Sequence, residues 1–134
     1  MGLTRDERDA IVLLRLQNAR QTLEDAKIIV HSKLWKAAAN RLYYACYYAA
    51  SALMIRFGLE AKTHAGIIRL LGLNFISKHL LNDELGKVYY KLFSLRLKGD
   101  YDDWTVVSEI DITPLIEPAE VFINEIEKLI EKTH

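Results

Sequence analysis

Cysteine is nearly absent from this chain of 134 residues, in which Cys46 is the only thiol. A lone cysteine can form neither a disulfide within the chain nor a cysteine-based metal site, which excludes a small scaffold held together by disulfides. Such sparing use of cysteine is typical of proteins from a reducing compartment. We therefore expect a cytoplasmic location.

Proline and glycine are also scarce, since the chain contains two prolines and six glycines and no stretch is rich in serine, glycine or proline. Segments of that composition form linkers and disordered tails, so we expect neither here. The length and the 51% share of hydrophobic residues suit one packed core. The sequence therefore predicts a single domain over residues 1–134.

Long hydrophobic runs are missing as well. The longest apolar stretch without a charge runs from Leu42 to Ile55 and lies between Arg41 and Arg56. It is shorter than the roughly 20 residues that a helix needs to span a bilayer. The opening residues, MGLTRDERDA, carry acidic side chains and no apolar core, which is unlike a secretory signal. We expect no membrane segment.

The common motifs of phosphate transfer and hydrolysis are absent: the chain has no Walker loop, no dinucleotide fingerprint and no G-x-S-x-G elbow. The acidic run Asp100, Asp102 and Asp103 lacks the glycine and the closing glutamate of an EF-hand loop. Three histidines have no partner at metal-ligand spacing and are expected on the surface: His31, His79 and His134. We therefore expect no bound metal and no cofactor.

Charge is unevenly distributed although the formal net charge is zero. Residues 1–99 contain 16 basic and 8 acidic side chains, whereas residues 100–134 contain 2 basic and 10 acidic ones. A basic body could offer a surface to phosphates, or the acidic last segment could pack beside basic helices so that the fields cancel. With no overall positive excess, we expect binding neither to duplex DNA nor to an anionic membrane.

Helical periodicity dominates the first half of the chain. The first predicted helix begins at the capping box Thr4-Arg5-Asp6-Glu7, ends near His31-Ser32 and carries apolar residues every three or four positions. The second runs from about Lys33 to Phe57 and is closed by Gly58, which can adopt a left-handed conformation. It is apolar almost all round, which predicts burial on more than one side. In so small a bundle, we attribute its second buried face to a partner subunit.

Three further helices are predicted. One follows the cap Thr63 and continues through Leu71, and the next begins at Asn82-Asp83-Glu84 and stops around Gly99. Residues 100–111 are interpreted as a loop, and the last helix is predicted to start between Pro114 and Pro118, because proline suits only an opening turn. The fold predicted is all-α: an up-and-down four-helix bundle with an additional short helix.

The second predicted helix carries Arg41, Tyr44 and Tyr48 on one face, because residues three, four and seven positions apart project the same way. An arginine held among aromatic rings can grip a phosphate with its planar donor fork, and the rings can stack on bases. The alternative is an arginine at a helix–helix or subunit interface, where the amphipathic tyrosines only fill space between the helices. The pattern alone leaves both interpretations open.

A second candidate group lies at the entry to the third predicted helix, where His64 follows Lys62 and Thr63. The helix N-terminus and the neighbouring lysine favour the neutral form of the imidazole, which can accept a proton. The alternative is an exposed histidine in a capping region.

The third candidate group ends the fourth predicted helix, where Arg96, Asp100 and Tyr101 occur in the run LRLKGDYDD. An arginine and an aspartate four residues apart commonly form a local ion pair that terminates a helix. That structural role accounts for at least part of this pattern.

Taken in order, these segments resemble those of the small stand-alone HEPN proteins (higher eukaryotes and prokaryotes nucleotide-binding). The resemblance rests on the run NRLYYACYYAA from Asn40, on Gly58-Leu59, on the run KTHAG from Lys62, and on Leu95-Arg96 with Asp100-Tyr101. It extends from the first predicted helix to Asp103. No single motif decides it; the order and spacing together do.

The resemblance implies a four-helix up-and-down bundle with an extra short helix, paired into a homodimer and often encoded beside a small nucleotidyltransferase that serves as the antitoxin. Many such proteins are toxins or defence proteins that cleave RNA without a metal. In those, an Arg-x(4–6)-His motif from each subunit meets across the dimer, with the arginine on the scissile phosphate and the histidine in the acid–base role.

Arg41 matches the arginine of that motif, but the histidine is replaced. In closely similar small proteins it falls seven residues after the arginine, where this chain has Tyr48; the shorter spacing falls on Cys46. The shorter spacing would leave Tyr48 where some members carry a tyrosine that the partner nucleotidyltransferase modifies. A phenol, with an ordinary pKa of about 10, is a weaker base at neutral pH than an imidazole at about 6.5, so the usual nuclease route is compromised.

Three hypotheses follow. The first is a HEPN-like dimer that binds a nucleotide or RNA without turnover, as the toxin-type half of a toxin–antitoxin pair. The second is a metal-independent ribonuclease toxin that uses Arg41 with Tyr48 or His64, and the third is a non-catalytic module that docks a nucleotidyltransferase partner. The residues expected to contact the nucleotide or RNA are Asn40, Arg41, Tyr44, Tyr48, Lys62, His64, Arg96, Asp100 and Tyr101.

Overall fold

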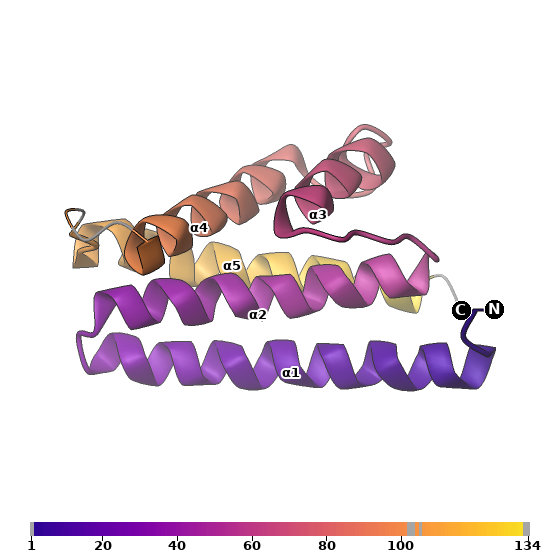
Figure 1. Cartoon of the computed structure of the whole chain (residues 1–134), viewed down its shortest axis with the longest axis horizontal. Helices are drawn as coiled ribbons and strands as arrows, with labels where there is room; N and C mark the ends of the chain where they lie inside the picture. The colour runs from indigo at the N-terminus through magenta and orange to yellow at the C-terminus, as the bar shows by residue number, and fades with distance from the viewer. Residues whose placement is uncertain (1, 102–103, 105, 133–134) are drawn as a thin grey trace.

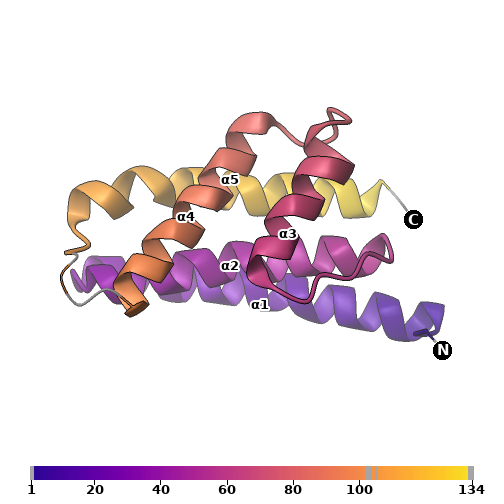
Figure 2. The ribbon, with the colours of Figure 1, turned by 45° about the horizontal axis from the view of Figure 1, so that its top comes forward.

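The computed structural model describes residues 2–101, 104 and 106–132, and every regular element in these ranges is helical. The elements in chain order are α1 (Arg5–His31), α2 (Trp35–Arg56), α3 (His64–Leu71), the π-helical turn η1 (Gly72–Ile76), α4 (Asp83–Tyr101) and α5 (Glu109–Glu131). Successive long helices alternate in direction, and α4 is inclined across α2 and α5 (Figure 1). Figure 2 shows the short α3 beside α4 on the same face. The predicted all-α up-and-down bundle with an extra short helix is confirmed.

Helix α2 is the centre of this bundle, because it packs against α1, α3, α4 and α5. Its side chains are mostly small where neighbours cross it, and small residues let helix axes approach closely. Six of its alanines are fully buried: Ala38, Ala39, Ala45, Ala49, Ala50 and Ala52. The predicted burial of this helix on more than one side is confirmed. Helices of the same chain supply that burial, so it needs no partner subunit to explain it.

Local signals set most helix boundaries where the sequence predicts them. At the start of α1, Thr4 Oγ1 accepts a hydrogen bond from the Glu7 N–H at 3.1 Å, and the Thr4 N–H donates to the Glu7 carboxylate at 3.0 Å. Gly58 adopts a φ of 68° just after α2, and Thr63 Oγ1 caps α3 by accepting from the backbone two residues inside it. Each of these contacts satisfies a backbone group that the helix end leaves free.

The start of α5 differs from the prediction. The helix begins at Glu109 after the cap Ser108, so Pro114 and Pro118 both lie inside it, and the predicted start between them is wrong. Each proline leaves the carbonyl four residues earlier without a helical donor. Those carbonyls belong to Ile110 and Pro114, both exposed, so water can hydrate them. The prolines are tolerated because the carbonyls that they release lie on the solvent side of the helix.

The connections on either side of α4 also differ in detail. Helix α4 continues past the predicted end at Gly99 to Tyr101. No sequence signal predicts η1, which continues directly from α3, because a π-helical turn has no hydrophobic period of its own. Gly86 of α4 packs closely beside this turn: a methyl group in place of its hydrogen would overlap Ile76 Cδ1.

Ion pairs join the acidic C-terminal helix to the basic N-terminal one. Arg20 Nε lies 2.8 Å from a Glu127 carboxylate oxygen, and Lys27 Nζ lies 3.1 Å from Glu120. Both pairs link α1 to α5. Of the two interpretations of the uneven charge, the pairing of acidic and basic helices therefore holds for this face.

The lone cysteine lies in the core. Cys46 is fully buried, and its thiol donates to the Ala119 carbonyl oxygen of α5 at 3.7 Å. Burial raises the pKa of this thiol well above its ordinary value. The side chain acts as a small apolar residue at the contact of α2 and α5.

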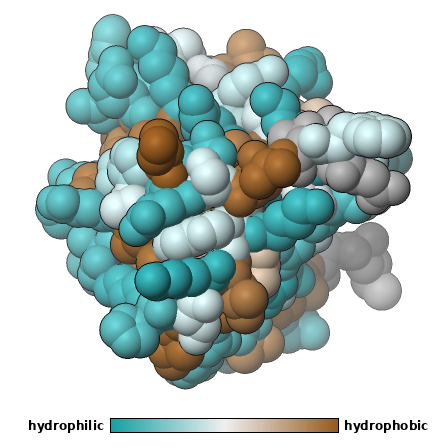
Figure 3. Space-filling view, turned by 90° about the vertical axis from the view of Figure 1, so that its left-hand side faces the viewer, coloured by the Kyte–Doolittle hydropathy of each residue, from teal (hydrophilic) through white to brown (hydrophobic). Residues whose placement is uncertain are grey.

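Polar and apolar side chains alternate at the end of the molecule where α1 turns into α2 (Figure 3). Apolar residues exposed near this end include Leu34, Val106 and Ile110. Figure 3 shows apolar side chains interspersed with polar ones on this face, as is ordinary for a protein surface. Within the described residues, no helix is both long enough and apolar enough to cross a membrane.

Candidate functional site

The first predicted group forms as expected along α2. The Arg41 guanidinium lies over the Tyr44 ring, with Cζ 5.4 Å from the ring centroid. Its Nε and Nη2 donate to Asn40 Oδ1 at 3.1 and 2.8 Å. Among the described residues it has no carboxylate partner, because its only polar contact is this neutral amide. Arg41 is thus a half-buried, preorganised cation whose charge no carboxylate of the described residues neutralises.

Tyr44 stands between two arginines. Cζ of Arg96, which comes from α4, lies 5.6 Å from the Tyr44 centroid, compared with 5.4 Å for Arg41. The Tyr48 ring follows one helical turn later at 6.3 Å. Positive charge near an aromatic face is attracted by the ring quadrupole. The tyrosine face of α2 is therefore a strip of rings with cations at one end.

Arg96 is buried, with 6% of its surface exposed. Its guanidinium lies 5.0 Å from the Tyr43 centroid and 5.8 Å from that of Phe93. The predicted ion pair with Asp100 is present but long, at 3.6 Å, and Arg96 Nε is buried without any hydrogen-bond partner. A buried charge with so little compensation is costly to the fold.

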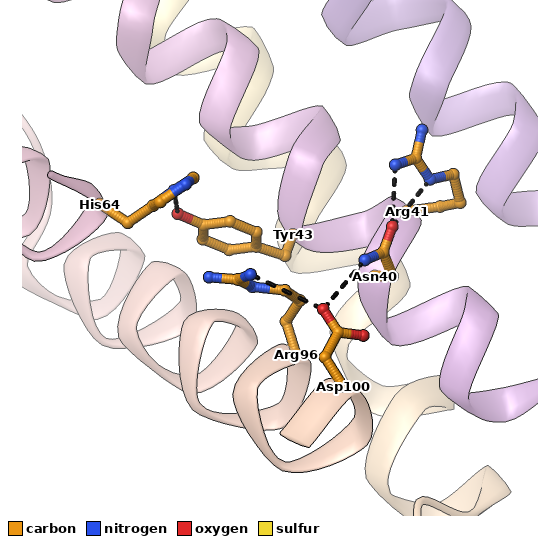
Figure 4. A network of polar contacts seen from close by, with 6 residues as sticks. All are labelled: Asn40, Arg41, Tyr43, His64, Arg96 and Asp100. Carbon is orange, nitrogen blue, oxygen red and sulfur yellow. Dashed lines mark hydrogen bonds and ion pairs between the residues drawn. The ribbon is translucent and has the colours of Figure 1, made fainter.

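A chain of polar contacts connects the two arginines. Asp100 pairs with Arg96 and also accepts a hydrogen bond from Asn40 Nδ2 at 3.3 Å, while Asn40 Oδ1 accepts from Arg41. Figure 4 shows Asp100 lying between Asn40 and the Arg96 guanidinium. Asn40 therefore uses its amide to position Arg41 on one side and Asp100 on the other.

His64 lies against the same aromatic strip. Its Nδ1 is 2.5 Å from the Tyr43 hydroxyl, and its ring lies 4.7 Å from the Tyr47 ring and 5.9 Å from Tyr44. Burial, and then the charge of Arg96, lowers the pKa of His64 below its ordinary value. This direction favours the neutral form, as the sequence predicts, but its causes are burial and Arg96 rather than the neighbouring lysine.

The Tyr43 hydroxyl is the inner end of this contact. It also accepts a hydrogen bond from the Tyr89 hydroxyl at 3.5 Å, and burial raises the pKa of Tyr43 to about 12. Sequence reasoning assigned neither tyrosine a role, because both belong to the apolar core pattern of their helices. A tyrosine at a buried position needs a partner for its hydroxyl, and that signal could have singled out Tyr43.

The structure thus brings together seven of the nine predicted ligand contacts and leaves two apart. The seven are Asn40, Arg41, Tyr44, Tyr48, His64, Arg96 and Asp100. Lys62 is exposed, forms no hydrogen bond or ion pair with any of these side chains, and lines an adjoining hollow with Tyr47 and Ser51. Tyr101 is 75% exposed and makes no ring contact or hydrogen bond with this group among the described residues.

His64 and Arg41 meet the same ring rather than each other, since both contact Tyr44. The two side chains come from different elements, α3 and α2, and lie apart in Figure 4. The hypothesis that His64 replaces the missing histidine beside Arg41 therefore has no direct contact to support it.

No group of three or more metal-ligating side chains occurs in the part of the chain that the structure describes. Asp102 and Asp103 of the acidic run lie outside that part, as does His134. His31 and His79 are exposed, as predicted.

Comparison with known proteins places the chain among similar sequences. The profile of the HEPN domain matches residues 12–129. A "UPF0332 protein" of Thermotoga maritima is 36% identical over 126 residues, covering 94% of this chain and 96% of its own length. A Methanocaldococcus jannaschii protein named "Putative toxin" is 33% identical over 130 residues, covering 97% and 96%.

A solved structure shows the same fold. A protein of Thermus thermophilus superposes with a TM-score of 0.75 over 87% of this chain and 96% of its own. The identity between the two is 17%, so this likeness concerns the fold alone.

Proposed function

The chain belongs to the HEPN family, and we propose that it forms a homodimer that binds a nucleotide or RNA through Arg41, Tyr44 and Tyr48. The observation that carries the proposal is the unneutralised guanidinium of Arg41. A planar donor fork can hold two phosphate oxygens at once, and hydrogen bonds between charged groups are about twice as strong as neutral ones. The neighbouring rings offer stacking surfaces to bases.

Binding without efficient cleavage suits this site better than a ribonuclease does. Cys46, which stands where the shorter spacing of the motif would put the histidine, is fully buried. Burial raises the pKa of its thiol, so this side chain cannot serve as a base. Tyr48, at the longer spacing, has a phenol, which is a weaker base at neutral pH than an imidazole. His64 is already hydrogen-bonded to Tyr43 and does not touch Arg41. The acid–base partner of the arginine is missing from the part of the chain that is described.

The toxin role is a further part of the proposal. Two relatives from Methanocaldococcus jannaschii are named as putative toxins, at 33% and 24% identity. We infer that this chain is the toxin-type half of a pair whose antitoxin is a nucleotidyltransferase, and that it acts in the cytoplasm. RNA bound without turnover would then be withheld from other proteins.

Equilibrium binding tests the proposed site. A fluorescently labelled single-stranded RNA oligomer is titrated with wild type, Arg41→Ala and Arg5→Ala at one fixed salt concentration, and nucleotides are added as competitors. We expect Arg41→Ala to weaken binding roughly tenfold to hundredfold, the effect of losing a charged hydrogen bond. Arg5→Ala removes the same charge from an exposed position on α1 and is the matched control. Equal affinities for wild type and Arg41→Ala would remove the proposed site.

Two further measurements separate the alternatives. Light scattering on the purified chain should give about twice the monomer mass of 15.4 kDa. A monomer would refute the proposed homodimer. Incubating the dimer with RNA should leave the RNA intact; cleavage that Arg41→Ala abolishes would establish the ribonuclease hypothesis instead.

A further inference from the structure

The hydrogen bonds around Tyr43 determine which nitrogen of His64 carries the proton. Three groups lie in a row: the Tyr89 hydroxyl donates to the Tyr43 hydroxyl, which in turn lies 2.5 Å from His64 Nδ1. The three come from α4, α2 and α3. Figure 4 shows the imidazole at the hydroxyl end of the Tyr43 ring, with the Arg96 guanidinium alongside that ring.

Only one arrangement of these hydrogen bonds gives an acceptor to the hydroxyl protons of both Tyr89 and Tyr43. Tyr89 is fully buried, and the Tyr43 hydroxyl is its hydrogen-bond partner in the described core. If Tyr43 donated to Tyr89 instead, the Tyr89 proton would be left unpaired in the core, which is unfavourable for a buried donor. Tyr89 therefore donates to Tyr43, and Tyr43 donates to Nδ1. A phenol is also a better donor than a neutral imidazole, and the imidazole nitrogen is the better acceptor.

The imidazole is neutral in this arrangement, so its one proton resides on Nε2. An imidazolium would have to donate from both nitrogens, which would reverse the bond to Tyr43. Burial, and then the neighbouring charge of Arg96, also oppose protonation, since both lower the pKa of His64.

The Nε2 atom remains reachable by a ligand. Among the described residues it makes no hydrogen bond. The only buried side-chain nitrogen or oxygen without a partner in that part of the chain is Arg96 Nε, so Nε2 is not sealed from solvent. It belongs to a ring that touches Tyr44, the same ring that supports Arg41.

We propose that Tyr43 is a positioning residue that fixes His64 in the Nε2–H tautomer, so that this histidine donates a hydrogen bond to a phosphate oxygen of the bound ligand. The ligand part of this inference rests on the proposed function. It names a phosphate or phosphodiester oxygen as the group recognised, because an Nε2–H needs an acceptor and the charges of Arg41 and Arg96 beside Tyr44 favour an anionic one. It also excludes His64 as a general base, since Nε2 has no free lone pair and Nδ1 is occupied by Tyr43.

Nitrogen NMR on the full chain labelled at histidine tests the tautomer without any ligand. We expect His64 to show a pyridine-type Nδ1 and a pyrrole-type Nε2 at pH 7.5, assigned through the ring carbon protons. Tyr43→Phe should convert this signature to a mixture of tautomers. Tyr47→Phe is the matched control, because Tyr47 contacts the His64 ring without a hydrogen bond. A protonated Nδ1 in wild type would overturn the assignment.

Binding of the same RNA oligomer tests the donor role. Gln can place an N–H where Nε2 stands but cannot act as an acid or base at neutral pH. We expect His64→Gln to bind within about threefold of wild type and His64→Leu to bind roughly fivefold to tenfold more weakly. Equal losses in both variants would refute the donor role while leaving the Arg41 site intact. If wild type itself bound no RNA or nucleotide, the proposed function and the ligand contact would fail together, and the NMR result would still decide the tautomer.

Discussion

The guanidinium of Arg96 lies 5.0 Å from the centre of the Tyr43 ring, inside the bundle, and one of its nitrogens has no hydrogen-bond partner. Its one ionic contact among the described residues, to Asp100, is 3.6 Å long. A core that only needed to be filled would hold an apolar side chain at this position. The retained charge instead adds to burial in lowering the pKa of His64 and contributes positive potential to the site.

Replacing Arg96 with methionine should therefore preserve stability and impair binding. Methionine fills a similar volume without a charge to desolvate, and such replacements of buried ions are often neutral or stabilising by about 1–4 kcal/mol. Urea unfolding should show Arg96→Met at least as stable as wild type, whereas Arg96→Ala should lose about 2–4 kcal/mol because it leaves a cavity. RNA affinity should fall in both. A strongly destabilised Arg96→Met would mean that the arginine is a structural element.

Substitution of two glycines should have unequal effects on stability. A methyl group at Gly86 would overlap Ile76 Cδ1, whereas one at Gly72 would meet nothing within 4 Å. We expect Gly86→Ala to be the less favourable of the two, because the Ile76 side chain must shift to admit the methyl group and this cost offsets the gain in helix propensity. Gly72→Ala should be neutral or stabilise by up to about 1 kcal/mol, because its helical φ suits alanine.

A double variant checks the cause assigned to Gly86. Ile76→Val removes Cδ1, the atom that the new methyl group would strike. Gly86→Ala with Ile76→Val should lose less stability than the two single variants together. Additive losses would show that the close contact of α4 with η1 is not the origin of the effect.

Stability should decline as the pH falls below about 6.5. The pKa of His64 is lower in the folded protein than its ordinary value of 6.5. The unfolded chain therefore binds a proton first as the pH falls, and the stability from the neutral histidine is lost between the unfolded and the folded pKa. The groups facing this ring are Arg96 from α4 and the tyrosines of α2.

Denaturant unfolding between pH 7.5 and 5 measures this effect. His64→Gln should flatten the dependence in that window. Glu7 and Asp111 also make the stability of the protein depend on pH, because hydrogen bonds to Thr4 and Ser108 lower their pKa values in the folded state. The stability that they contribute is lost only below their ordinary pKa values of 4.5 and 3.8, outside the pH range in which His64 acts. An unchanged slope in His64→Gln would contradict the assignment to this histidine.

The sequence could predict what depends on neighbours along the chain. Thr4 with Glu7, Gly58 and Thr63 mark helix ends through contacts within a few residues, and the structure confirms each of these predicted ends. Arg41 and Tyr44 share a helix face, so their contact follows from helical geometry. Such features need no knowledge of the tertiary fold.

The rest of the site depends on packing between helices. Tyr43, His64 and Arg96 lie on three elements, and nothing in their local sequences fixes the distance between them. Their contacts depend on the inclination of α4 and on the loop that leads into α3. The proline rule failed for α5 for a related reason, because the exposure of Ile110 and Pro114 is a property of the assembled bundle.

The enclosure of Cys46 between α2 and α5 makes this residue an intrinsic probe of conformational opening. A thiol reagent can reach the sulfur only when these two helices separate, so the rate of its modification in native buffer reports how often the bundle opens. Ligand binding that stabilises the closed bundle should slow this modification by the same factor that it adds to stability. Since the chain holds no other thiol, the measurement needs neither an introduced cysteine nor the removal of a native one.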